Sequence, residues 1–135
     1  MASNSANIGI AVIRIGIGLM YGLHGIFKVL AGTQELMALG ESFGQLTGLP
    51  LNHEWMGWLA AISQILSGLL LATGIKKIWG LLIGLPPLLI AMIILIKEGE
   101  PFSHISHPIE LSILFTGLLI YYRGVPGKQR ISFKA

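Results

Sequence analysis

Hydrogen-bonding and ionisable side chains recur along one face of the first apolar segment. At about 100° per residue on a helical wheel, Arg14, Tyr21, His24 and Lys28 fall within an arc of roughly 120°. Ionisable groups at membrane depth are costly, so they usually face a bundle interior and mark a binding or proton-handling site. This favours a functional role for His24. The alternative is structural: Arg14 and Lys28 snorkel to the two interfaces, and His24 only completes the stripe.

A second group of such side chains precedes the fourth apolar segment. His104, His107 and Glu110 are spaced three residues apart, so they share one flank of a helix that begins early enough. Pro108 suits the first position of a helix, which makes Ser106 or His107 the expected N-cap. We therefore expect these side chains near the outer mouth of a helical bundle.

Two chemistries fit such a cluster once His53 joins it from another outer segment. A quinone headgroup offers oxygens that His and Lys side chains bond, and a His or Glu110 passes protons when the ring is reduced. Alternatively, imidazoles with a carboxylate suit Zn²⁺ or Cu²⁺, with His53, His104 and His107 as candidate ligands, although their spacing matches no specific metal motif. A third interpretation leaves His104 and His107 as solvated loop residues.

The composition limits the class of protein that must position these groups. Of the 135 residues, 53% are apolar and 11% are charged, which is under half the usual charge content of a soluble domain. This excludes a disordered chain, a nucleic-acid binder with a basic surface and an ordinary soluble enzyme. The chain has no Cys and no recognisable haem or flavin motif, so no redox centre of its own is identified.

Four segments are long and apolar enough to cross a bilayer, which needs about 20 residues per helix. They run over residues 8–31, 55–73, 78–96 and 105–122. Between the first two, apolar residues at helical spacing predict an interfacial helix over 34–47. We therefore expect one all-α domain over residues 1–135, an integral membrane four-helix bundle in contact with lipid.

The distribution of Lys and Arg around the spans predicts the topology. Six basic residues lie near the span ends on the side that carries both termini: Lys76, Lys77, Arg123, Lys128, Arg130 and Lys134. Only Lys28 and Lys97 lie on the other side. The positive-inside rule then places the N and C termini in the cytoplasm.

Several segments together resemble the DoxX family of small four-helix membrane proteins. Arg14–Lys28 resembles the family's opening pattern of Arg, Gly and then His-Gly-x-x-Lys. The resemblance continues through 46–50, 67–74, Glu110 and the tail 124–132. It implies a four-helix bundle in a bacterial or archaeal cytoplasmic membrane, and a membrane component of redox systems such as a quinol oxidase or a thiosulfate:quinone oxidoreductase.

One residue departs from the family pattern. Gln64 stands in the second span, where the family often has Glu. An amide bonds a partner but carries no proton, so proton transfer through this helix is placed in doubt.

The combined hypothesis is a polar pocket in the outer half of the bundle. Its expected ligand-binding residues are Arg14, Tyr21, His24, Lys28, Gln64, His107 and Glu110. The pocket is expected to bind a quinone in a quinone-binding or membrane-anchoring subunit, with electrons supplied by a redox partner. The alternatives are a non-catalytic membrane scaffold, or a protein that handles metal or small solutes through its histidines. Solute transport by four helices is expected to need a homo-oligomer.

Overall fold

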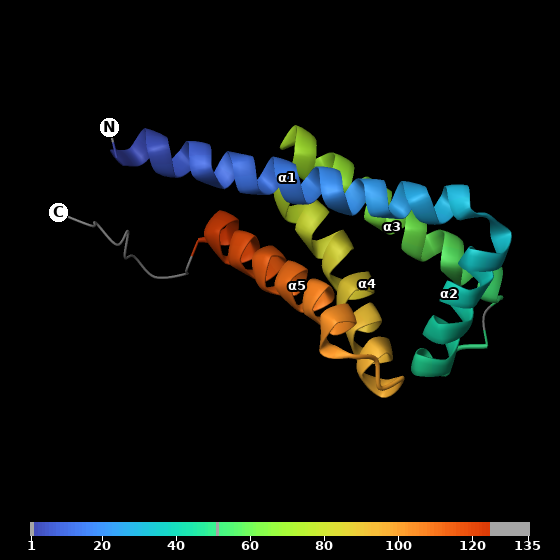
Figure 1. The fold of residues 1–135 in the computed structure, drawn as a ribbon. Coiled ribbons are helices and arrows are strands. Elements are labelled where there is room, and N and C mark those ends of the chain that lie inside the picture. Colours follow the sequence, from blue (N-terminus) through green and yellow to red (C-terminus); the bar gives the residue numbers. More distant parts are fainter. Residues whose placement is uncertain (1, 51, 125–135) are drawn as a thin grey trace.

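The computed structural model describes residues 2–50 and 52–124, and these form helices joined by short connections (Figure 1). The helices are α1 (Ala2–Ala31), α2 (Thr33–Thr47), α3 (His53–Thr73), α4 (Lys77–Lys97) and α5 (Phe102–Arg123). No strand occurs in the described ranges, so the all-α expectation is confirmed. Lys128, Arg130 and Lys134 of the charge count, and the tail of the resemblance beyond residue 124, lie outside them.

Four of these helices have the length and composition of membrane spans, as expected for an integral membrane bundle. They are Ser5–Ala31 within α1, and the whole of α3, α4 and α5. A helix of 21 residues, such as α3 or α4, is roughly 30 Å long, which matches the hydrocarbon core of a bilayer. α2 is too short to span and lies where an interfacial helix was expected.

The expected start of the last helix was wrong. Neither Ser106 nor His107 is its N-cap, because α5 begins at Phe102 with Pro101 as the N-cap. Pro101 has an extended backbone, and its carbonyl accepts hydrogen bonds from the backbone N–H of His104 at 2.9 Å and of Ile105 at 3.3 Å. This earlier start draws His104 and His107 into the helix and leaves Pro108 in its interior rather than at its first position.

The spans pack in the order α1, α3, α4, α5, and α2 lies against α3. Figure 1 shows α1 and α3 side by side over much of their length, while α4 crosses between α3 and α5. Glycine permits the close approach of α1 to α3: a Cβ atom at Gly68 would lie 2.5 Å from the backbone N and Cα of Gly22. Because glycine has no side chain, the backbones of α1 and α3 can pack in direct contact here.

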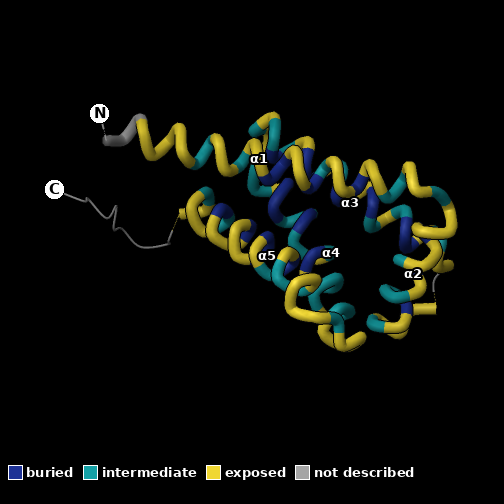
Figure 2. Tube along the Cα trace, in the orientation of Figure 1, coloured by how far each residue is buried: buried dark blue, intermediate teal, exposed yellow. Residues whose placement is uncertain are grey.

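Buried residues gather where the four spans meet, and the outer surfaces are apolar and exposed (Figure 2). The central cluster consists of Ile17, Tyr21, Leu71, Leu81, Leu88, Leu111, Phe115 and Leu118. Leu30, Leu59 and Ile113 are among the large apolar side chains left exposed. Such a surface is unfavourable in water but suits lipid, so the outer faces of the spans contact the membrane.

The start of α1 and the end of α5 lie at one end of the molecule, here called the terminal end. The Tyr121 hydroxyl donates to the side-chain oxygen of Asn7 at 3.2 Å, and the Lys77 ammonium lies 4.6 Å from the centroid of the Tyr122 ring. The turn between α3 and α4 therefore shares this end. α2 and the turn between α4 and α5 lie at the opposite end.

Candidate functional site

Near the terminal end, Arg14 of α1 reaches the end of α3. Its guanidinium donates to the backbone carbonyl of Leu71 and, at 3.4 Å, to that of Ala72. These carbonyls belong to the last turn of α3, which ends at the left-handed Gly74 and carries the negative end of the helix dipole. Arg14 therefore satisfies a helix terminus and ties α1 to α3.

One level deeper, two hydroxyl groups bond to the backbone of α4. The Tyr21 hydroxyl donates to the Gly84 carbonyl and the Ser67 hydroxyl to the Gly80 carbonyl, each at 2.7 Å. Both side chains are almost fully buried. The ring of Tyr21 also meets the ring of Phe115 edge to face, with centroids 5.1 Å apart. The two hydrogen bonds join α1 and α3 to α4, and the ring contact joins α5 to α1.

Beyond Tyr21 toward the opposite end, a small cavity lies between the four spans. Its volume is about 60 Å³. It is lined by Met20, Tyr21, His24, Lys28, Gln64, Leu88, Ala91, His107, Pro108 and Leu111. The structure thus brings together Tyr21, His24, Lys28, Gln64 and His107 of the expected set. Arg14 and Glu110 do not line this cavity.

Gln64 supplies a deeply buried polar group to the cavity. The residue is only 4% exposed, and its Oε1 atom has no hydrogen-bond partner among the described residues. A buried acceptor left without a donor costs about 1–3 kcal/mol. The Oε1 atom can therefore accept a hydrogen bond from a donor placed in the cavity.

The mouth of the cavity carries basic side chains from two helices. The rings of His24 on α1 and His107 on α5 have centroids 6.5 Å apart and planes tilted by 55°. Both histidines are exposed, while Lys28, one turn after His24, is half-buried. An imidazole both donates and accepts, and an ammonium only donates, so the mouth offers donors to an oxygen while Gln64 offers an acceptor inside.

The remaining candidate residues lie apart from the cavity. Nδ1 of His104 is 2.7 Å from a carboxylate oxygen of Glu100, one turn earlier in the chain. His53 begins α3 and lies against Gly44 of α2. Within residues 2–50 and 52–124, no three His, Asp or Glu side chains are grouped to hold a metal ion, so His53, His104 and His107 do not form one site there.

Comparison with known families agrees with this architecture. A sequence model named DoxX matches residues 9–97, which is well over half of the chain. The chain belongs to the DoxX family. No curated protein and no solved structure matches it. The DoxX match contains Tyr21, His24, Lys28 and Gln64 and ends before α5, which carries His107.

Sequence reasoning did not identify Ser67 as a structural residue or Leu88, Ala91 and Leu111 as the apolar wall. Ser67 was visible only as part of a motif shared with the family. Ser67 follows Gln64 by three residues, so the two side chains share one face of α3, and this spacing could have indicated that Ser67 also faces the bundle interior. The wall residues carry no signal of this kind, because apolar residues are common throughout the spans.

Proposed function

We propose that this DoxX-family protein is a membrane subunit of a quinone-linked oxidoreductase, and that its cavity binds the polar edge of a quinone headgroup. The observation that carries the proposal is the buried, unpartnered Oε1 atom of Gln64, which borders a cavity with His24, Lys28 and His107 at its mouth. A ligand here needs both a donor and an acceptor, and it must dissolve in the membrane. A quinol meets these requirements, because each hydroxyl both donates and accepts, while its oxidised quinone has acceptors only.

The size of the cavity limits how the headgroup binds. Its volume of about 60 Å³ is smaller than the roughly 150 Å³ of an engineered cavity that holds benzene. One ring oxygen therefore enters, while the ring itself stays at the mouth near His24 and His107. A quinol hydroxyl donates to Gln64 Oε1, and a quinone carbonyl accepts from Lys28 or His24.

The reaction that this arrangement serves is the two-electron exchange between quinol and quinone. Oxidation of a quinol releases two electrons and two protons, and we assign acceptance of the protons to the imidazoles of His24 and His107. Glu110 lies exposed almost one turn after His107 and passes protons toward solvent. A partner subunit takes the electrons.

The same proposal assigns the orientation. We place the terminal end in the cytoplasm, because Lys76, Lys77 and Arg123 lie near it while Lys28 and Lys97 end spans on the other side. The cavity then lies in the outer half of a bacterial or archaeal cytoplasmic membrane. Quinone exchange occurs from lipid, and proton exchange occurs with the outer aqueous phase.

A scaffold without a ligand is the second candidate, favoured by the bonds of Arg14, Tyr21 and Ser67 to backbone carbonyls. These bonds show that part of the polar stripe holds helices together. A purely structural stripe leaves Gln64 Oε1 without explanation, however, so the two candidates differ in what they predict for this residue.

Mass spectrometry of organic extracts from purified protein separates the two candidates. We expect a stoichiometric quinol, or the quinone it oxidises to on extraction, in the wild type and at least about 10-fold less in Gln64→Met, because the buried hydrogen bond from the quinol hydroxyl, worth about 1.4 kcal/mol, is lost. Gln34→Met is the matched control, since Gln34 is exposed on α2. Equal retention in Gln64→Met contradicts the assigned site, and no quinone in the wild type favours the scaffold.

A further inference from the structure

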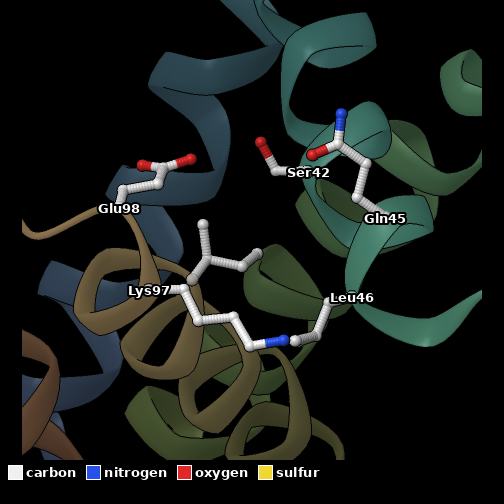
Figure 3. A pocket seen from close by; sticks show the side chains of 6 residues that line it. Ser42, Gln45, Leu46, Lys97 and Glu98 are labelled. Carbon is white, nitrogen blue, oxygen red and sulfur yellow. The ribbon is translucent and has the colours of Figure 1, made fainter.

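A second pocket, remote from the cavity, lies between α2 and the end of α4 (Figure 3). Its volume is about 200 Å³. Ser42, Gln45 and Leu46 line it from α2, and Ile94, Lys97 and Glu98 line it from α4. No residue of this pocket borders the cavity around Gln64.

The pocket lies at the level of a membrane interface. α4 is a membrane span that ends at Lys97, and Glu98 is its C-cap. α2 buries Leu36, Gly40 and Gly44 and leaves Ser42 and Leu46 half-buried. It contacts the first turn of α3 through the close approach of Gly40 to the carbonyl of His53. Both sides of the pocket, α2 and the end of α4, therefore lie at the depth of the phospholipid headgroups.

The polar groups of the pocket include one charge of each sign. Figure 3 shows Lys97 and Glu98 extending in different directions from the end of α4, with the Ser42 hydroxyl and the Gln45 amide on the α2 wall. Both charged residues are exposed, and they are adjacent in the chain. An ammonium and a carboxylate at neighbouring positions complement a ligand that itself carries an anion and a cation.

An apolar groove lies farther along α4, between α3 and α4, and Phe43 of α2 borders it. Its volume is about 220 Å³, and its lining includes Phe43, Ala60, Pro86 and Ile90. Ile90 precedes Ile94 by four residues on α4, and Phe43 precedes Leu46 by three on α2, so each pair shares one helix face. The polar pocket at the interface and the apolar groove at membrane depth therefore adjoin along α4, as the polar and apolar parts of one lipid require. The pocket and the groove together are called the seam below.

We infer that this seam binds one zwitterionic phospholipid with a primary ammonium, its phosphate bonded to Lys97, its ammonium to Glu98, and one acyl chain in the groove beside Pro86. The Ser42 hydroxyl and the Gln45 amide add hydrogen bonds to headgroup oxygens. Phosphatidylethanolamine has this chemistry. Phosphatidylcholine lacks the N–H donors that a carboxylate accepts, and phosphatidylglycerol lacks the cation.

Native mass spectrometry of the delipidated full chain, titrated with each of these three lipids, tests the assignment. The wild type should retain one phosphatidylethanolamine about 10-fold more tightly than either other lipid, as one charge-assisted hydrogen bond allows. Lys97→Gln should weaken binding of all three lipids. Glu98→Gln should remove the preference for phosphatidylethanolamine over phosphatidylglycerol. Lys76→Gln, at an exposed Lys near the terminal end, is the matched control and should leave binding unchanged.

A variant in the groove tests the acyl-chain part separately. Ala60→Phe fills the groove and should weaken retention of the diacyl lipid while the oligomeric state and helix content stay unchanged. Equal retention of the three lipids by the wild type overturns the inference, as does binding that neither Lys97→Gln nor Glu98→Gln alters. A preference for phosphatidylglycerol that Glu98→Gln strengthens also overturns it, because the site then selects an anionic lipid.

Discussion

Two levels of the helical bundle differ in the hydrogen-bond partners of their buried polar side chains, and they are called here the structural level and the ligand level. Near the terminal end, Arg14 and Tyr21 bond to backbone carbonyls of α3 and α4. Farther along, Gln64 Oε1 has no partner among the described residues and borders a cavity. Burial does not separate the two levels, since Tyr21 is 2% exposed and Gln64 is 4% exposed. The presence or absence of a partner separates a structural polar residue from a candidate ligand site.

The largest effect is expected where α1 and α3 pack most closely, beside the structural level. In Gly68→Ala, the new Cβ meets backbone atoms of Gly18 and Gly22, which cannot move without separating the helices. We expect the free energy of unfolding to fall by about 3 kcal/mol, the upper part of the range for overpacking. Circular dichroism during denaturation in mixed micelles measures this change.

Gly117→Ala is the control for this substitution. A Cβ at Gly117, within the span α5, has no atom within 4 Å, so Ala should stabilise the helix slightly through its higher propensity. If both variants lose the same free energy of unfolding, the close packing of α1 on α3 at Gly68 is not a main source of the bundle's stability.

The next largest effect is a gain in the free energy of unfolding, and it is expected at Gln64, in the ligand level. Gln64→Met keeps a similar side-chain volume and removes the unpartnered acceptor, so the ligand-free protein should gain about 1 kcal/mol. The same denaturation experiment, on delipidated protein, measures it. A loss of more than about 1 kcal/mol would assign Gln64 to the structural level instead.

Ser67→Ala tests a residue of α3 that, unlike Gln64, bonds to a backbone carbonyl. It removes the hydroxyl that donates to the Gly80 carbonyl at 2.7 Å, so the free energy of unfolding should fall by about 1 kcal/mol. Quinone retention should stay at the wild-type level, because Ser67 does not line the cavity. Lost retention in a folded Ser67→Ala variant would show that the two levels are not separate.

The smallest effect is expected outside both levels. His104 pairs with Glu100, but their side chains are 64% and 37% exposed. Exposed pairs contribute little, so His104→Ala should change stability by less than about 0.5 kcal/mol and leave quinone retention intact. A marked loss of retention, measured by extraction and mass spectrometry, would place His104 in the site.

The fold was predictable because membrane spans carry a strong signal in their length and composition. Gly32, Gly48 and Gly74 interrupt the apolar pattern, and the first three helices end next to them. The start of α5 was not predictable in this way. Pro101 and Pro108 both suit a helix start, and the sequence does not reveal that the backbone adopts its helical turn after the first of them.

The site was predictable in part. Wheel geometry on α1 and family resemblance on α3 identified His24, Lys28 and Gln64, since ionisable or amide groups are conspicuous in apolar spans. The sequence does not reveal that Arg14 bonds to backbone carbonyls whereas His24 lines the cavity. This difference depends on which carbonyls of α3 lie opposite α1, and this depends on the register in which glycines let the helices pack. Glu110 stays a prediction, because it lies outside the cavity lining.

The central claim is that the Oε1 atom of Gln64 accepts a hydrogen bond from a ligand donor. Thermal denaturation of delipidated wild type and Gln64→Met, each with and without a short-chain quinol, tests it most directly. A ligand at 100 times its dissociation constant stabilises its site by about 2.7 kcal/mol. The account predicts that Gln64→Met melts higher without quinol, and that quinol raises the melting temperature of the wild type only. Equal quinol shifts in both proteins, or none in either, would contradict it.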